Sequence, residues 1–276
     1  MRSLLAIAGK ELTEAVRNRW VVAATLLLGA LALSLTLLGS TPTGTVGVNA
    51  LDVVIVSLSS LGILLLPLIA LLISHDALVG EVERGTMLLL LAYPVTRRQI
   101  VLGKFLGHMV VLAIATLVGF GAAGVAVVFT GADVDRQSWE AFGAMIGSSL
   151  LLGGAFVAIG YCTSALARSR AAAAAVAICL WLLFVVVYDL ALLGVLVADQ
   201  GAHIGSGVLE TVLLFNPTDA YRLLNLTGFA NVSLFSGMAG LGGTVALGSG
   251  VLLAALVGWI LLPLGLATAL FARREL

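Results

Sequence analysis

Long apolar segments separated by short charged stretches constrain this chain more than any other feature. Six runs of about 20 or more mostly apolar residues lie at about 21–39, 51–74, 101–130, 140–166, 171–197 and 245–271. A helix of about 20 residues rises about 30 Å, which is enough to cross the hydrocarbon core of a bilayer. None of the runs shows the alternation over about 10 residues that is typical of barrel strands. The sequence therefore predicts an all-α integral membrane protein with six transmembrane helices.

Composition supports this class and limits the domain organisation. Hydrophobic residues make up 61% of the chain and charged residues only 10%, whereas soluble domains are roughly half apolar and a quarter charged. No stretch has the composition of a separate soluble domain. We therefore expect one membrane domain over residues 1–276, surrounded by lipid, and no nucleic-acid partner.

The formal net charge of zero hides an asymmetry in where the basic residues lie. Twelve of the 14 Lys and Arg residues precede the first run, follow the last, or fall between runs two and three or four and five; the other two are Arg136 and Arg222. By the positive-inside rule, the basic side is cytoplasmic. An even number of spans independently puts both termini on one side. The chain is thus predicted to be a multi-pass protein of a bacterial inner membrane with both termini in the cytoplasm, and residues 198–244 are expected to be extracytoplasmic.

Residues 3–19 have the periodicity of an amphipathic helix lying in the membrane interface. Apolar residues recur at spacings of one, three or four, and the opposite, water-facing side is expected to carry Lys10, Glu11, Glu14 and Arg17. Two interpretations stay open here. The helix is either a positive anchor for the first span or an elbow that also touches a cytoplasmic partner.

The loop over residues 75–100 is predicted to contain a short polar helix. Gly80 and Gly85 bracket about one helical turn, with acidic residues near its start and Arg84 near its end, an order that suits the helix dipole. The apolar run that follows, Thr86 to Tyr93, is too short to span a membrane, and Pro94 stops it. We expect this run to lie along the headgroups or to dip into the membrane only slightly.

The third span is predicted to begin just after Thr96. Thr96 and Gln99 have the spacing of a capping box ahead of an apolar run. Arg97 and Arg98 then fall in the first helical turn, where cations oppose the macrodipole. Either lipid phosphates or acidic partner residues offset that cost, or the two arginines are ordinary topogenic charges.

The order of these motifs resembles the ABC-2 type of ABC transporter permease, over the whole chain. The resemblance rests on Lys10-Glu11, on Gly80-Glu81-x-Glu83-x-Gly85-Thr86, on Tyr93-Pro94-Val95-Thr96-Arg97 and on Gly103-Lys104. It implies a homodimer that works with two copies of a separate cytoplasmic ATPase, which binds ATP and Mg. The chain itself has no Gly-x-x-x-x-Gly-Lys-Ser/Thr phosphate loop and is expected to be non-catalytic, without a bound cofactor. The residues that the resemblance assigns to ATPase coupling are Glu81, Glu83, Arg84, Gly85, Thr86, Arg97 and Arg98.

A narrower resemblance comes from the segment Asn216-Pro217-Thr218-Asp219-Ala220-Tyr221-Arg222. It is similar to the membrane subunits of the system that matures the copper centres of nitrous oxide reductase. This implies a periplasmic, copper-handling β-helical partner protein that docks within residues 199–240. The residues assigned to that docking surface are Asn216, Pro217, Asp219, Tyr221 and Arg222.

Metal-binding residues are sparse and scattered. The candidates for copper(I) are His75, His108, His203, Cys162 and Cys179, together with five Met, and none forms a C-x-x-C, M-x-x-M or clustered His pattern. Both cysteines fall in predicted spans, where packing is their more common role. We expect neither a metal site nor a structural disulfide, which favours a mechanical role over a copper channel.

Asp189, beside Tyr188, is the clearest carboxylate within a predicted span. Such groups are costly in lipid and usually face a bundle interior or a cavity. One interpretation places Asp189 near the outer interface. The other makes it a dimer-interface or cavity residue that is bonded to a tyrosine or a backbone donor.

Three functions compete. The resemblance favours a permease that transmits ATPase motion to an extracytoplasmic copper-assembly partner. A conventional exporter of a small molecule, lipid or sulfur species has the same fold, and ATP-dependent accumulation in sealed vesicles is required only of it. A membrane-embedded enzyme needs paired catalytic groups at bilayer depth, and the sparse ionisable residues do not supply a convincing pair.

Overall fold

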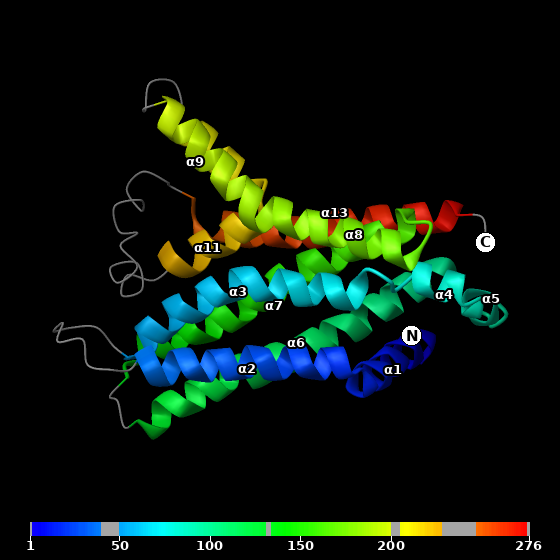
Figure 1. The fold of residues 1–276 in the computed structure, drawn as a ribbon, viewed down its shortest axis with the longest axis horizontal. Coiled ribbons are helices and arrows are strands. Elements are labelled where there is room, and N and C mark those ends of the chain that lie inside the picture. The colour runs from blue at the N-terminus through cyan, green and yellow to red at the C-terminus, as the bar shows by residue number, and fades with distance from the viewer. Residues whose placement is uncertain (1, 40–49, 131–133, 200–204, 228–246, 275–276) are drawn as a thin grey trace.

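The structure, a computed structural model, describes residues 2–39, 50–130, 134–199, 205–227 and 247–274. These residues form helices and short connections, with no strand among them (Figure 1). Six helical segments are long and apolar enough to cross a membrane: Val21–Leu38, Leu51–Glu83, Arg97–Phe129, Arg136–Leu166, Arg170–Asp199 and Ser249–Arg273. The predicted helical membrane fold with six spans is confirmed.

The bounds of the helices agree with the predicted runs to within a few residues. In chain order they are α1 (Arg2–Arg17), α2 (Arg19–Gly39), α3 (Ala50–Ser74), α4 (Val79–Glu83), α5 (Thr86–Leu91), α6 (Arg97–Phe129), α7 (Arg136–Leu166), α8 (Arg170–Leu182), the π-helical turn η1 (Leu183–Val187), α9 (Tyr188–Asp199), α10 (Ser206–Leu214), α11 (Pro217–Thr227) and α13 (Ser249–Arg273).

Helix α7 lies at the centre of the bundle. It packs along α3 and α13 and also contacts α6 and α11, while α2 packs along α6 on the far side from α13 (Figure 1). In the 18-residue apolar stretch that is long enough for α7 to span a membrane, 67% of the residues are buried. In the corresponding stretch of the segment Arg170–Asp199, only 6% are buried. The segment from α8 to α9 therefore lies on the outside of this chain, with its apolar side chains exposed.

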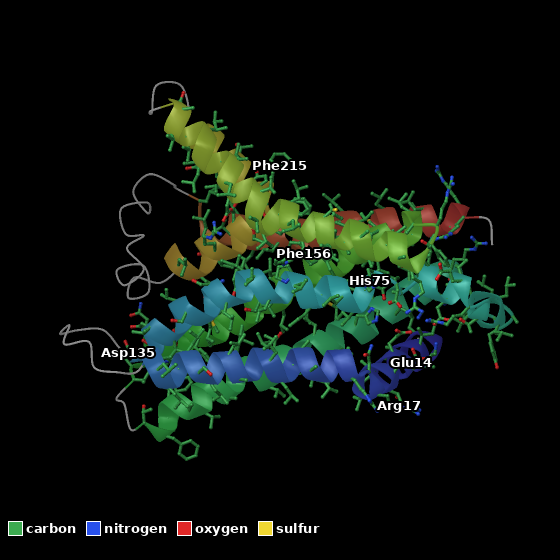
Figure 2. All side chains as sticks on the ribbon, in the orientation of Figure 1. Glu14, Arg17, His75, Asp135, Phe156 and Phe215 are labelled. Carbon is green, nitrogen blue, oxygen red and sulfur yellow. The ribbon has the colours of Figure 1, made fainter. Side chains whose placement is uncertain are left out.

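Helices α1, α4 and α5 and the end of α13 lie at one end of the bundle (Figure 1). We call it the basic end, because twelve of the 14 Lys and Arg residues fall in the segments that meet there. Glu14, Arg17 and His75 lie at this end, and Asp135 lies at the opposite end (Figure 2). The described chain thus begins and finishes at the same end, as an even number of spans requires.

Local sequence signals set several helix starts. Thr96 and Gln99 form the predicted capping box at the start of α6, and Ser169 Oγ accepts the N–H of Ala172 at the start of α8. Gly85 joins α4 to α5 with φ +72°, a left-handed conformation that glycine adopts at little cost. The short helix expected between Gly80 and Gly85 is α4.

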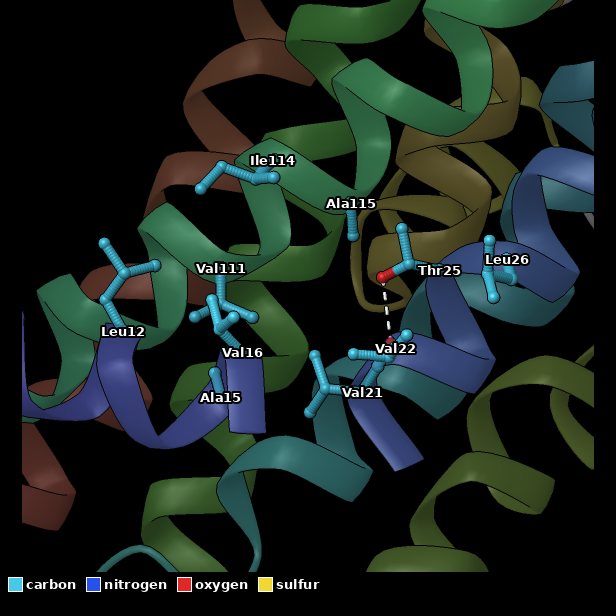
Figure 3. Close-up of a pocket in the computed structure, with 10 residues that line it drawn as sticks. All are labelled: Leu12, Ala15, Val16, Val21, Val22, Thr25, Leu26, Val111, Ile114 and Ala115. Atoms are coloured by element: carbon cyan, nitrogen blue, oxygen red, sulfur yellow. Dashed lines mark hydrogen bonds between the residues drawn. The ribbon is translucent and has the colours of Figure 1, made fainter. Parts of the chain in front are cut away.

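The structure corrects one prediction about α1. Glu11, expected on the water-facing side, is buried against α6, whereas Leu5 and Val16 are exposed. An ion pair with α6, described below, explains the burial. Where α1 and α2 meet α6, a hollow of about 200 Å³ is lined by apolar side chains, with Thr25 as its one polar residue (Figure 3).

Candidate functional site

Five side chains from four helices form a buried polar cluster at the basic end. We call Glu11 on α1, Glu81 on α4, Lys104 and His108 on α6, and Tyr161 on α7 the basic-end cluster. Lys104 Nζ donates to Glu11 Oε1 at 2.5 Å and to Glu81 Oε1 at 3.0 Å. The side chains of Lys104, Glu11 and Glu81 are only 3%, 6% and 3% exposed. One ammonium group therefore joins three helices where water is largely excluded.

His108 and Tyr161 extend the cluster to the central helix. His108 Nε2 lies 3.3 Å from Glu11 Oε2, and its Nδ1 lies 2.9 Å from the hydroxyl of Tyr161. The two rings meet edge to face, with centroids 5.7 Å apart. Both oxygens of Glu11 thus have partners, as a buried carboxylate requires.

More exposed residues complete the partners of Glu81. Lys10 Nζ lies 3.1 Å from Glu81 Oε1 and 3.2 Å from Glu14 Oε1. The hydroxyl of Thr86 donates to Glu81 Oε2. Because both Glu81 oxygens are bound within the chain, this side chain fixes α4 to the bundle.

The electrostatics of α1 follow from these contacts. Burial acts to raise the pKa of Glu11, but the hydrogen bond to His108 and the charge of Lys104 outweigh burial and lower that pKa to about 2. For Lys10, burial acts to lower the pKa, and the contact with Glu81 raises it above the usual value. Both groups are therefore charged at neutral pH.

Two glycines of α6 let α1 approach closely enough for these contacts. A Cβ at Gly103 would lie 2.9 Å from Cβ of Ile7, and a Cβ at Gly107 would lie 2.6 Å from Cβ of Glu11. Real Cβ atoms do not approach so closely, so any larger residue would displace α1. The spacing of four between small residues is the usual device for close helix packing in membranes.

The start of α8 and the end of α7 hold α4 from the other side. Ser164 Oγ accepts the backbone N–H groups of Leu78 at 2.9 Å and Val79 at 3.0 Å. The guanidinium group of Arg170 donates to Asp76 Oδ2 at 2.9 Å, and the backbone N–H of Arg170 donates to Glu83 Oε1 at 3.1 Å. The first residue of α8 is thereby bound to Asp76, just before α4, and to the last residue of α4.

The residues predicted to couple to an ATPase differ in how far they are exposed. Glu81 is buried and Thr86 is half-buried, and both take part in internal hydrogen bonds. The exposed members are Glu83, Arg84, Gly85 and Arg98. Only these four present their side chains or backbone to a partner in this conformation.

Arg97, the remaining member, binds the end of the last helix. Its guanidinium group donates to the carbonyl oxygens of Phe271 at 2.9 Å and Arg274 at 2.5 Å. Its charge also lies 5.7 Å from the centre of the Phe271 ring. Carbonyls at a helix C-terminus carry the negative end of the dipole, which offsets the cost of a cation in the first turn of α6.

In the half of the molecule away from the basic end, α10 and α11 form a helical hairpin that enters the bundle. Helix α11 packs against α3, α7 and α13. At the turn, Trp259 Nε1 on α13 donates to the carbonyl of Leu214 at 3.1 Å. Farther along α11, the hydroxyl of Tyr221 lies 2.9 Å from that of Ser149 on α7. Both contacts fall more than two helical turns inside α13 and α7.

The hairpin turn binds the π-helical turn η1. Asn216 Nδ2 donates to the carbonyl of Phe184 at 2.9 Å, and Thr218 Oγ1 donates to the same oxygen at 3.2 Å. A π turn interrupts the regular α-helical hydrogen bonds, and a freed carbonyl in a membrane needs another donor. The Asn-Pro-Thr sequence supplies two such donors.

Arg222 forms the second group of buried charges. It donates to Asp189 Oδ2 on α9 at 2.5 Å and to Asp219 Oδ1 at 2.7 Å, and Asn216 Nδ2 donates to Asp219 Oδ2 at 3.0 Å. We call Asp189, Asn216, Asp219 and Arg222 the hairpin cluster. The partner of Asp189 is thus an arginine, rather than the tyrosine or backbone donor that one of the two interpretations of this residue required. Tyr188 instead donates to the carbonyl of Val212 at 2.5 Å.

The residues assigned to periplasmic docking lie elsewhere than expected. Asn216, Pro217, Asp219 and Tyr221 are buried, and Arg222 is half-buried. Their side chains contact other helices of the same chain, because their polar groups complete the hydrogen bonds of η1, α7 and α9. They do not form an open docking surface in this conformation. The rest of the expected outer segment, residues 200–204 and 228–246, lies outside the described residues.

The described copper-ligand candidates lie apart. Cys162 donates to the carbonyl of Pro263, His75 Nδ1 lies beside carbonyls of its own helix, and His108 belongs to the basic-end cluster. His203 lies outside the described residues. Among the described residues, no group of three or more His, Cys, Asp or Glu is placed to hold a metal ion.

The sequence singled out Glu11, Glu81, Asp189, Asp219 and Arg222, but not the contacts that these residues make. Lys104 and Arg170 had been counted with the topogenic charges, Lys104 was also part of the family resemblance, and the contacts of Ser164 and Tyr161 were not predicted. One signal was available for α6. Lys104 and His108 are spaced by four beside two glycines with the same spacing, which places two polar groups on the face where another helix can approach.

Together, these observations define a polytopic helical membrane protein with a short loop helix fixed at one end and a helical hairpin inserted from the other. The chain belongs to the ABC-2 family of transporter proteins, whose sequence pattern matches residues 5–276.

Two relatives match almost throughout. The chain is 45% identical over 271 residues to the "Probable ABC transporter permease protein NosY" of Pseudomonas aeruginosa, covering 98% of both chains. It is 44% identical over 276 residues to the protein of the same name from Stutzerimonas stutzeri, covering 99% of both chains. The family resemblance read from the sequence is therefore confirmed.

Proposed function

We propose that this permease couples ATP hydrolysis by a separate cytoplasmic ATPase to an event on the other side of the membrane. That event is the assembly of the copper centres of nitrous oxide reductase through a periplasmic partner. The family and the two NosY relatives support the assignment. This chain supplies no catalytic group to the process, and ATP and Mg belong to the ATPase.

One structural observation carries the mechanical part of this proposal. Arg170 binds Asp76, just before α4, and Glu83, the last residue of α4. Phe184, in η1 at the other end of α8, binds the hairpin. Phe184 follows Arg170 by 14 positions, which correspond to about 21 Å of helix. A displacement of α4 by a partner therefore pulls on α8, and α8 acts on the hairpin.

In this proposal, the basic end faces the cytoplasm of a bacterial inner membrane. The concentration of Lys and Arg at that end supports this orientation. Reporter fusions to the C-terminus distinguish the two orientations. A reporter that is active only in the periplasm must be inactive there, and activity would reverse the topology.

The exposed residues of the coupling loop are the proposed ATPase contacts. Glu83, Arg84, Gly85 and Arg98 are accessible, whereas Glu81 acts from within by holding α4 in place. A partner that moves α4 needs both an accessible surface and a rigid connection behind it. The loop and the basic-end cluster supply these two parts.

Co-purification tests the coupling claim. Glu83→Lys combined with Arg98→Glu reverses two exposed charges, and we expect the coexpressed ATPase to be lost from the purified membrane subunit. The control is Arg136→Glu, an exposed charge at the opposite end. An intact complex with unchanged ATP turnover in the loop variant would remove the docking claim.

The proposed assembly contains two copies of this chain, two ATPase subunits and the periplasmic partner. Cys179 lies exposed on α8, and the segment from α8 to α9 is largely uncovered within one chain. A mass measurement on the detergent-solubilised complex tests this composition. A mass that corresponds to a single permease subunit would exclude the homodimer.

A further inference from the structure

A groove with an apolar floor and a charged mouth lies between α2 and α3 at the basic end. Its volume is about 540 Å³, and its lining comes from α2, from the second half of α3 and from four charged or polar residues outside these helices: Asn18, His75, Asp76 and Arg170. Leu27 and Leu72 in its walls are 53% and 51% exposed. The groove is therefore open along its side as well as at its mouth.

The apolar part of the groove has the depth of an acyl chain within one leaflet. On α2 its lining runs from Val21 to Leu27, and on α3 from Leu65 to Ile73. These stretches correspond to roughly 9 Å and 12 Å of helix at 1.5 Å per residue. One leaflet contributes about half of a hydrocarbon core of roughly 30 Å. Ala23, a small residue in the α2 wall, leaves room for an occupant.

The mouth of the groove continues into a second, polar cavity of about 220 Å³. The two cavities share Asn18, Asp76 and Arg170, and the second one also borders Glu14 and the basic-end cluster. Lipid-facing apolar walls thus lead directly to charged groups at the same level as the loop helix. An apolar hollow alone would not have this second part, and the hollow between α1, α2 and α6 lacks it (Figure 3).

The charges at the mouth have both signs. Lys104, Glu11 and Glu81 bind one another and are almost completely buried. The groups left at the boundary are Asp76, Arg170, Arg84 and, farther out, Glu14, whose side chains are 26%, 49%, 47% and 55% exposed. Glu14 Oε1 lies 3.2 Å from Lys10 Nζ. Asp76 and Arg170 lie 2.9 Å apart. A ligand head that carries both a cation and an anion can add to such a pair without leaving either charge unmatched.

We propose that this groove is a binding site for one membrane phospholipid with a zwitterionic, primary-ammonium head, that is, phosphatidylethanolamine. One acyl chain lies between α2 and α3, the phosphate accepts hydrogen bonds from Arg170, and the ammonium group donates to Asp76 and Glu14. A lipid with an anionic head can still contact Arg170 through its phosphate, but it has no ammonium group to donate to these two carboxylates. The lipid is a resident ligand, and the inference is independent of the proposed ATPase and copper roles.

Lipid retention tests this site on the purified full chain. The protein is reconstituted in vesicles of equimolar phosphatidylethanolamine and phosphatidylglycerol, re-extracted in mild detergent and analysed by native mass spectrometry. We expect phosphatidylethanolamine to be retained about tenfold over phosphatidylglycerol, the ratio that corresponds to one charge-assisted hydrogen bond. Equal retention of the two lipids, or retention of neither, would overturn the proposal.

Two variants separate the groove from its mouth. Ala23→Phe fills the apolar part and should abolish retention, whereas Ala30→Phe, on the same face of α2 but outside the groove lining, should not. Asp76→Asn should keep a bound lipid and reduce the preference for phosphatidylethanolamine to below about threefold. Full retention in Ala23→Phe, or an undiminished preference in Asp76→Asn, would show that the lipid binds elsewhere. A dimeric protein that retains no lipid because its second copy fills the groove would also contradict the proposal.

Discussion

The basic-end cluster and the hairpin cluster share an arrangement of charges but differ in their surroundings. Each places one cation between two carboxylates. Lys104 is 3% exposed and joins Glu11 and Glu81 from two other helices. Arg222 is 30% exposed, and its partners are Asp189, at 27%, and its own helical neighbour Asp219, at 1%.

This difference separates an anchor from a movable contact. Charges that are fully removed from water cannot separate without leaving uncompensated groups behind, whereas partly exposed charges can regain hydration. The basic-end cluster therefore fixes α1 and α4 to α6. The contact between Arg222 and Asp189 can break and re-form while the hairpin moves relative to α9.

Removing the cation of the basic-end cluster should have the largest effect. Lys104→Met leaves Glu11 and Glu81 buried without their shared partner, and we expect the free energy of unfolding to fall by about 3–5 kcal/mol. Denaturant titration in detergent micelles measures it. The control is Lys10→Met, which removes a more exposed partner of the same Glu81 and should cost less than about 1 kcal/mol. Equal losses in the two variants would mean that the cluster is not an anchor.

The equivalent change in the hairpin cluster should cost less. Arg222→Met leaves Asp189 and Asp219 without their cation, but Asp189 retains access to solvent, so we expect a loss of about 1–3 kcal/mol. A double-mutant cycle with Asp189→Asn isolates the coupling between the two helices. A loss equal to that of Lys104→Met, or a coupling energy of zero, would contradict the proposed difference between the clusters.

Close packing of α1 against α6 is a second difference between the two clusters, because only the basic-end cluster depends on it. Gly107→Ala places a Cβ 2.6 Å from Cβ of Glu11 and 3.0 Å from the carbonyl of Ala8, so α1 must shift. We expect a loss of about 1–3 kcal/mol in the same titration. The matched control is Gly121→Ala in the same helix, which has no atom within 4 Å and should stabilise the helix by up to about 1 kcal/mol. Losses of the same size at both positions would indicate a general intolerance of α6.

The sequence predicted the features that depend on local patterns. The length of the apolar runs predicted the six spans, and the spacing of Thr96 and Gln99 predicted the start of α6. The positions of Gly80 and Gly85 predicted α4 to within one or two residues. These signals are local because each follows from neighbouring residues within one helix or turn. The predicted coupling loop is therefore close to the observed one.

Contacts between distant segments were not predictable in the same way. The ion pairs of Lys104 join residues 93 and 23 positions away. Nothing local marks Glu11 as buried, because its neighbours Lys10 and Glu14 are exposed. Similarly, the polar segment Asn216–Arg222 had the composition of an exported loop. Its side chains lie inside because the π turn and Asp189 offer partners that a single sequence does not reveal.

The smallest expected effect tests the contact between the hairpin and η1. Thr218→Val keeps the shape of the side chain and removes the hydroxyl, which lies 3.2 Å from the carbonyl of Phe184 and 2.7 Å from Asn216 Oδ1. Asn216 Nδ2 still donates to that carbonyl. We expect the free energy of unfolding to fall by only about 0.5–1.5 kcal/mol. The matched control is Thr211→Val in α10, whose hydroxyl bonds only within its own helix and whose loss should have little effect. If the two variants are equally stable, the Phe184 carbonyl does not depend on Thr218, and among the bonds to that carbonyl only the one from Asn216 links η1 to the hairpin.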